Sequence, residues 1–293
     1  MLLPLVVGVD GSDSSLLAVD WAVGEAARHG LPLRLVNASR WERYEGTSLD
    51  VHTLGRPTRH APADTVVGVA AERAHRRNPD VAVSVDVLAE DAVTALLDAG
   101  RNASALITGS RGRGGIRDLL LGSVGLAVAA RAHCPVIVVR GDKAGLEGTH
   151  ERILLGVAEP PKGSAAVRFA FREAEARGCT LDAVRAWRSP AHEPVDHPLI
   201  VGGPEHYLEE QAASLIEEAL GEAVRERPEV VVRRDTVEGP AHKVLVERSA
   251  AADMIIVGAA RRRHGHLGLQ LGRVAHAALH HAYCPVAVVP QSS

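Results

Sequence analysis

Short apolar runs alternate along the chain with longer segments in which apolar residues recur every three or four positions. The longer segments predict amphipathic helices, and the short runs predict buried strands. In the first half the strands are expected near 5–9, 33–38, 81–88, 104–108 and 136–139, and the helices near 14–29, 64–77, 90–101 and 123–132. Strands separated by helices form parallel sheets, and runs such as "VAVSVDV" (81–87) and "MIIVG" (254–258) are apolar enough to be covered on both faces.

The second half of the chain repeats the first. Residues 6–36 run parallel to residues 154–184, and "RAHCPVIVVR" near position 131 returns as "HAYCPVAVVP" near position 281. Strands are therefore expected again near 153–157, 180–186, 230–235, 253–257 and 286–289. The sequence predicts two domains, 1–141 and 151–293, joined by the linker "GDKAGLEGTHE", which is rich in glycine and charge.

Composition narrows the classes of function. With 46% apolar and 24% charged residues, the 293-residue chain has the composition of a globular protein with a buried core. A net charge of −3 and an aromatic content of 3% argue against a nucleic-acid or membrane partner. The three cysteines lack the spacing of a disulfide framework, and no secretory signal or membrane span is visible, so we expect a cytoplasmic protein. Cys134 and Cys284 both precede a proline and a buried strand, which indicates core thiols.

Candidate chemistry is concentrated where the strand "ALIT" ends, in "GSRGRGGIRDLLLGSVG" (109–125). Ligands of open α/β sheets bind at the carboxyl ends of the strands. Glycines there let backbone amides approach an anion, and a helix that begins at Gly122–Ser123 would add a positive dipole end. Arg111, Arg113 and Arg117 add positive charge. The alternative is a tight loop whose serine only caps the helix.

Gly109, Gly112, Gly122 and Ser123 spell G-x2-G-x9-G-S, and with this motif the chain resembles the ATP-binding members of the universal stress protein family. "VVGVDGSDSS" and "CPVIVV" occur in the order found in that family, and the resemblance covers both halves. It implies an α/β fold of two tandem doubly wound, five-stranded parallel sheets of strand order 3-2-1-4-5, which is a Rossmann-like, adenine-nucleotide-binding fold.

The resemblance also implies which residues bind ATP, with or without Mg²⁺. Asp10 would contact the nucleoside, the backbone at Ala38 would face the adenine, and the glycine-rich stretch would surround the ribose and phosphates. The alternative for Asp10 is a turn-forming residue before Gly11. The full set of candidate residues is Val9, Asp10, Gly11, Ser12, Ala38, Gly109, Arg111, Gly112, Gly122, Ser123 and Val124.

The second copy departs from this pattern. Ala158 stands at the place of Asp10, Arg261 at that of Gly112, and Gly272–Arg273 at that of the Gly–Ser pair. The motif is degenerate, which puts ATP binding in this half in doubt. Its arginines and histidines form either a site for another anionic ligand or a solvated basic face.

These observations favour an ATP-binding regulatory protein of the stress response that acts as a nucleotide-dependent switch and is not an enzyme beyond slow hydrolysis. Two alternatives are an ATP-using enzyme of the related pyrophosphatase-like class and an interaction protein without a ligand. By the resemblance, the last strands of the two domains would pair as an intramolecular pseudo-dimer. A homodimer and a regulatory protein partner are further expectations.

Overall fold

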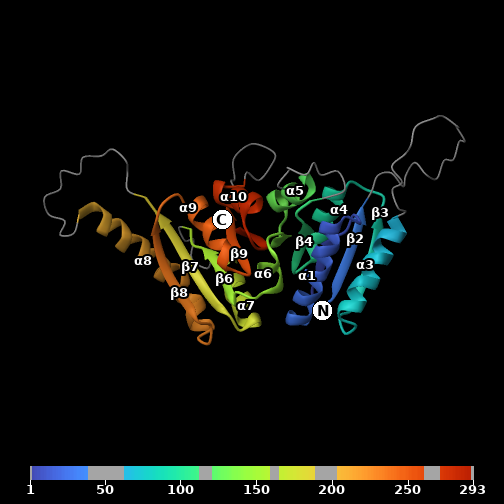
Figure 1. Ribbon diagram of the computed structural model, residues 1–293, viewed down its shortest axis with the longest axis horizontal. Helices are drawn as coiled ribbons and strands as arrows, with labels where there is room; N and C mark the ends of the chain where they lie inside the picture. Colours follow the sequence, from blue (N-terminus) through green and yellow to red (C-terminus); the bar gives the residue numbers. More distant parts are fainter. Residues whose placement is uncertain are drawn as a thin grey trace, which may run out of the picture. The chain divides into compact units, whose positions relative to one another are not determined.

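The computed structural model describes residues 2–38, 63–111, 121–158, 165–188, 203–260 and 271–291 (Figure 1). The chain divides into two compact units, residues 1–139 and 140–293. None of the helices in these described ranges has the length and apolar character needed to cross a bilayer.

The sheet of the first unit confirms the expected topology, with all strands parallel in the order β3-β2-β1-β4-β5. The strands are β1 (Leu5–Gly8), β2 (Leu33–Ala38), β3 (Val83–Leu88), β4 (Ala105–Gly109) and β5 (Val136–Val139). The helices are α1 (Asp13–His29), α3 (Ala63–Arg77), α4 (Ala92–Ala99) and α5 (Ser123–Arg131), with a short 3₁₀ turn η1 (Gly100–Asn102) after α4.

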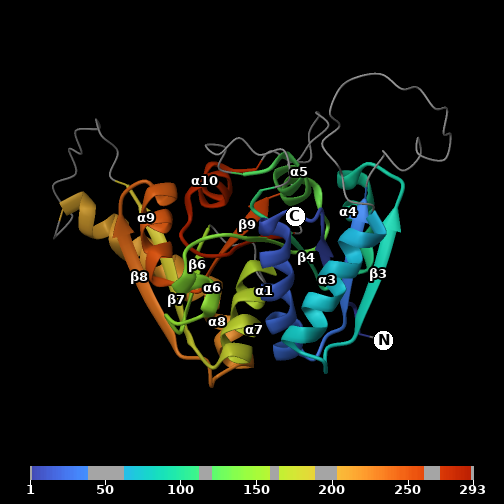
Figure 2. The same cartoon turned by 45° about the vertical axis from the view of Figure 1, so that its right-hand side comes forward.

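Helices cover both faces of this sheet. α1 and α3 pack side by side on one face (Figure 2), and α4 contacts α5. Because the crossovers are right-handed and the strand order reverses after β3, α4 and α5 lie on the opposite face. The central strands are therefore largely apolar, and Val6, Val7, Leu106 and Ile107 are fully buried.

One strand is more exposed than its sequence suggests. The run 81–87 was expected to be covered on both faces, but within the described residues β3 pairs with β2 alone and is an edge strand. Val85 is 46% exposed, and Asp86 forms an ion pair with Arg34 of β2. In contrast, the run 254–258 is buried from Met254 to Val257, as predicted.

The second unit repeats the topology, with its parallel strands in the order β8-β7-β6-β9-β10. These strands are β6 (Arg152–Gly156), β7 (Thr180–Trp187), β8 (Val232–Glu238), β9 (Met254–Ala260) and β10 (Val286–Gln291). The helices are α7 (Ala165–Arg177), α8 (Gly203–Glu226), α9 (Ala241–Arg248) and α10 (Arg273–His281), with a 3₁₀ turn η2 (Ser249–Ala251) after α9. The pairing expected between the two last strands stays a prediction.

The segment expected to be a linker folds onto the second unit. It contains the short helix α6 (Lys143–Glu147), and the amide of Asp142 donates to the carbonyl of Tyr283 at 3.0 Å. Gly141 has φ of +107°, and a Cβ there would lie 2.2 Å from that same carbonyl oxygen. Both the conformation and the close approach require glycine, so its abundance here marks tight packing.

Cys134 and Cys284 are core residues, as predicted, with exposed fractions of 8% and 0%. Burial raises the pKa of the Cys134 thiol to about 11 and raises the pKa of the Cys284 thiol further. Both therefore stay protonated and unreactive at neutral pH.

Candidate functional site

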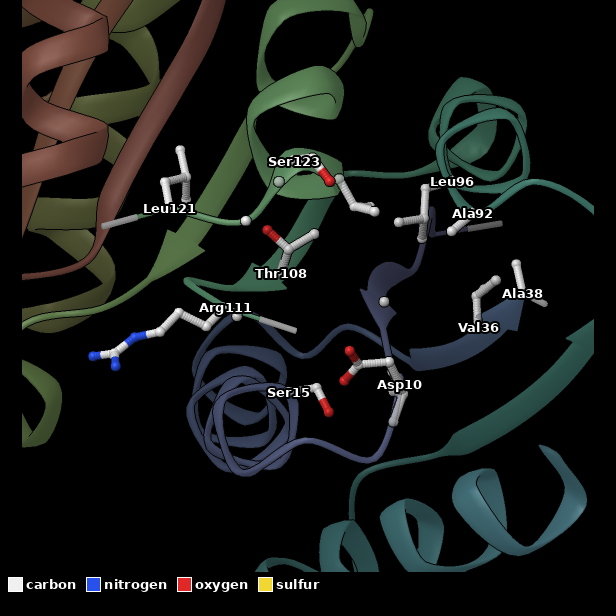
Figure 3. Close-up of a pocket in the computed structure, with 16 residues that line it drawn as sticks. Asp10, Ser15, Val36, Ala38, Ala92, Leu96, Thr108, Arg111, Leu121 and Ser123 are labelled. Atoms are coloured by element: carbon white, nitrogen blue, oxygen red, sulfur yellow. The ribbon is translucent and has the colours of Figure 1, made fainter. Parts of the chain in front are cut away.

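A cavity of about 310 Å³ opens in the first unit, at the carboxyl ends of β1, β2 and β4 (Figure 3). This is the end of a doubly wound sheet at which ligands bind. Its walls come from the turn after β1, the end of β4, α4 and the start of α5. The lining residues are Gly8, Val9, Asp10, Ser15, Val36, Ala38, Ala92, Leu96, Thr108, Gly109, Arg111, Leu121, Gly122, Ser123, Val124 and Gly125.

The turn after β1 is fixed by its neighbour β2. The amide of Val9 donates to the carbonyl of Val36 at 2.9 Å, and the buried side-chain amide of Asn37 donates to the carbonyl of Val9 at 2.7 Å. Beyond Asp10 the chain reverses at Gly11, whose φ is +78°, and α1 begins with Ser12 as its N-cap. Asp10 is thereby held at the rim of the sheet.

Asp10 forms the turn that was considered as its alternative role, and its side chain also lines the cavity. One carboxylate oxygen accepts hydrogen bonds from the amide and the hydroxyl of Ser12, at 3.0 and 2.6 Å, so the residue does form the turn. The same side chain lines the cavity, and Figure 3 shows it on the side where Ser15 lies. The turn therefore fixes the direction of a carboxylate that faces the cavity.

Gly109 is a glycine because α1 passes very close to it. A Cβ at this position would lie 2.3 Å from Ser14 Oγ and 2.5 Å from the Ser14 carbonyl oxygen. The Ser14 hydroxyl also accepts a hydrogen bond from the amide of Arg111 at 2.9 Å. Bare backbone at the end of β4 thus serves the packing of β4 against α1.

Several backbone amides of the glycine-rich stretch are used by the fold itself. The amide of Ser110 donates to the carbonyl of Val139 at 3.1 Å, and that of Gly122 donates to the carbonyl of Ser110 at 2.8 Å. The Ser110 amide thus joins the glycine-rich stretch to β5, and the Arg111 amide joins it to α1. The bond from Gly122 to Ser110 lies within the stretch. These three amides are therefore not open to an anion.

The open donors lie instead at the start of α5. Gly122 is the N-cap and forms no side-chain capping bond, so Ser123 is the first residue of the helix and does not cap it. The first turn of any helix leaves its amides without intrahelical acceptors. Those of Ser123, Val124 and Gly125 lie at the cavity wall, where the helix dipole also favours an anion.

The predicted arginine contributes differently than expected. Arg111 is exposed and lines the cavity. Figure 3 shows that its side chain extends away from the cavity. Gly112, Arg113 and Arg117 lie outside the described residues. Within the described lining, the start of α5 is therefore the feature that points positive partial charge at the cavity.

One wall of the cavity is apolar. Val36 and Ala38 of β2 face Ala92 and Leu96 of α4, and Leu96 is 4% exposed. Gly8 makes this approach possible, because a Cβ there would lie 3.0 Å from Leu96 Cδ1. Such a wall suits the flat face of an aromatic ring.

Eight of the eleven predicted site residues line the cavity: Val9, Asp10, Ala38, Gly109, Arg111, Gly122, Ser123 and Val124. Gly11 and Ser12 form the adjoining turn, and Gly112 lies outside the described residues. Sequence reasoning missed the other lining residues, which are Gly8, Ser15, Val36, Ala92, Leu96, Thr108, Leu121 and Gly125. No motif marks these residues, although a helix was expected near 90–101, where α4 lies.

The equivalent place in the second unit is built differently. Gly258 corresponds to Gly109, but a Cβ on Gly258 would lie 2.8 Å from the side-chain nitrogen of Gln291. The side-chain oxygen of Gln291 accepts from the amide of Ala165, at the start of α7, at 3.1 Å. The unit's own glutamine side chain therefore lies at the end of β9.

Comparison with known proteins agrees with this architecture. The model of the universal stress protein family matches residues 1–140 and again 149–290. A universal stress protein of Mycobacterium tuberculosis is 31% identical over 98% of this chain and 97% of its own. The crystal structure of a universal stress protein from Archaeoglobus fulgidus has a TM-score of 0.70 and 18% identity, covering 99% of this chain and 98% of that one.

A universal stress protein solved in complex with cAMP is 27% identical to this chain but covers only 47% of it, with a TM-score of 0.35. The two matches to the family model together span nearly the whole sequence, one in each half. The chain therefore belongs to the universal stress protein family, as a tandem pair of its domains.

Proposed function

We propose that the first unit binds ATP and that the protein is a nucleotide-dependent regulatory switch of the stress response, with little or no hydrolysis. The observation that carries the proposal is the cavity itself, in which an apolar wall, a carboxylate and the start of a helix surround one space. These are the three environments that a base, a ribose and a phosphate group require.

The three parts of a nucleotide can be assigned to these environments. The base would lie between Ala38 and Leu96, and the Asp10 carboxylate would accept from ribose hydroxyls. The phosphates would lie at the first turn of α5, where amides and the helix dipole favour negative charge. A volume of about 310 Å³ falls at the small end of the range for ligand sites.

Among the described residues, the lining of the cavity offers few groups for catalysis, which supports binding over turnover. Among the described residues that line the cavity, Asp10 and Arg111 carry the only ionisable side chains. Asp10 also holds the turn through Ser12, and Arg111 extends away. Rapid phosphoryl transfer needs carboxylates for Mg²⁺ and a group that orients the nucleophile. Any Mg²⁺ would therefore enter with the triphosphate.

Isothermal titration calorimetry of the purified chain with ATP and AMP tests the proposal. Asp10→Asn keeps an oxygen that can accept from Ser12 but removes the charge, so we expect affinity to fall by at least about tenfold. Asp98→Asn, on an exposed carboxylate, is the control and should bind like the wild type. Failure of the wild type to bind either nucleotide would refute the proposal.

A further inference from the structure

Thr108 is a polar residue in a place where strands of this sheet carry apolar ones. It is the penultimate residue of β4, follows the buried Leu106 and Ile107, and is only 5% exposed. Its hydroxyl finds no hydrogen-bond partner in the described part of the chain, and the residue lines the cavity. A valine would fill the same volume without leaving a buried donor unpaired.

The hydroxyl lies under the first turn of α5. A Cβ added to Gly125 would come within 3.3 Å of Thr108 Oγ1, so the absence of a side chain at Gly125 leaves this space open. Figure 3 shows the Thr108 side chain pointing from β4 toward the start of the helix, where Ser123 lies. The Thr108 side chain and the open amides of α5 therefore lie at the same wall of the cavity.

An unpaired buried hydroxyl destabilises a free protein, because folding strips its water and supplies no replacement. Such groups are rare, and each one calls for a specific explanation. A ligand that brings an acceptor oxygen would supply the missing bond. Since the helix start beside it favours negative charge, that acceptor is best supplied by an anion.

We propose that Thr108 is a specificity-determining residue whose hydroxyl donates a hydrogen bond to the phosphate group attached to the nucleoside. The inference rests on nucleotide binding in the first unit. It makes Thr108 a buried sensor for the first phosphate, so the site distinguishes a nucleotide from its nucleoside. It also assigns a purpose to Gly125, which keeps the path between hydroxyl and phosphate clear.

The test compares AMP with adenosine, by calorimetry, in wild type, Thr108→Val and Thr108→Ser. Thr108→Val keeps the shape and removes only the donor, so AMP should bind at least about tenfold more weakly while adenosine binding stays within about twofold. Thr108→Ser keeps the donor and should bind AMP within about threefold of wild type. Equal weakening of AMP and adenosine, or no weakening of AMP, would overturn the inference.

Thermal unfolding gives a second readout that a merely structural role would not reproduce. Without ligand, Thr108→Val should melt at the same temperature as wild type or higher, because an unpaired hydroxyl is gone. With AMP present, its melting temperature should rise less than that of wild type. If Thr108→Val does not fold, the test uses Thr108→Ser, which keeps the hydroxyl donor. Loss of AMP binding by Thr108→Ser would then overturn the proposal. Wild type that binds no nucleotide would refute the proposed function itself, and this inference with it.

Discussion

Gly109 has no side chain because the backbone of α1 leaves no room for one. Its missing Cβ would meet the Ser14 carbonyl oxygen and carbonyl carbon at 2.5 and 2.6 Å, and backbone atoms cannot turn aside as a flexible side chain can. We expect Gly109→Ala to destabilise the protein by about 1–3 kcal/mol and to weaken nucleotide binding. Urea unfolding followed by circular dichroism measures the first effect, and calorimetry measures the second.

Gly24→Ala is the matched control for Gly109→Ala. Gly24 lies within α1, and a Cβ there would meet nothing within 4 Å. Alanine favours helix over glycine by up to about 1 kcal/mol, so this variant should be as stable as wild type or more so. If both variants shifted the urea midpoint alike, the packing of β4 against α1 would not explain Gly109.

At the scale of single residues, the sequence could predict those members of the candidate site that belong to a recognisable motif. Asp10 stands out through the family resemblance, and Gly109 and Ser123 stand out through the spacing of the glycine-rich motif. Thr108 and Leu96 did not stand out, because one is an ordinary strand residue and the other an ordinary helix residue. Only the approach of α4 and α5 to the sheet gives these two a place in the site.

Helix α10 carries a group of histidines whose titration should be visible in stability. The rings of His276 and His280 stack with their centroids 4.4 Å apart, and His281 follows directly. Burial lowers the pKa of His280 below its ordinary value of 6.5, and His276, His281 and Arg140 lower it further. The folded state therefore binds a proton at His280 less readily than the unfolded chain does.

The sign of the effect follows from that difference. As pH falls below about 6.5 the unfolded chain takes up a proton that the folded state resists, so stability falls with pH. Between about pH 7.5 and pH 5.5, His280→Gln should lose less stability than wild type in urea unfolding. His75→Gln, at an exposed position of α3, is the control. An unchanged loss in His280→Gln would show that His280 does not titrate in this way.

At the scale of elements, hydrophobic period located strands and helices to within a few residues, because both faces of a central strand must be apolar in a doubly wound sheet. The hydrophobic period did not reveal that β3 lies at the edge of the sheet, since β3 is nearly as apolar as its covered neighbours. It also gave no sign that Gly141 and Asp142, in the segment expected to be a linker, lie against Tyr283. Glycine is common both in flexible segments and in tightly packed ones, and only the position of Tyr283 decides between them.

For the whole molecule, duplication has produced two sheets of one topology with unequal sites. The first unit has Asp10 at the end of its first strand and an open cavity at α5. In the second, Ala158 offers no acceptor, α10 begins at Arg273, and the Gln291 side chain approaches Gly258. The Gln291 side chain accepts from the amide of Ala165 and donates to the carbonyl of Val289. These bonds leave it with fewer groups that could bind a nucleotide.

This asymmetry predicts one ATP bound per chain. Calorimetry with ATP should give a stoichiometry of one, and in Asp10→Asn this single set of sites should bind at least about tenfold more weakly. If the second unit bound ATP equally well, a set of sites with the affinity of wild type would remain in Asp10→Asn. Steady-state turnover should also stay far below the range of about 1–1000 per second that is typical of enzymes.

Because each copy is a complete five-stranded sheet, loss of the ligand from one unit needs no loss of fold in the other, which circular dichroism of Asp10→Asn would verify.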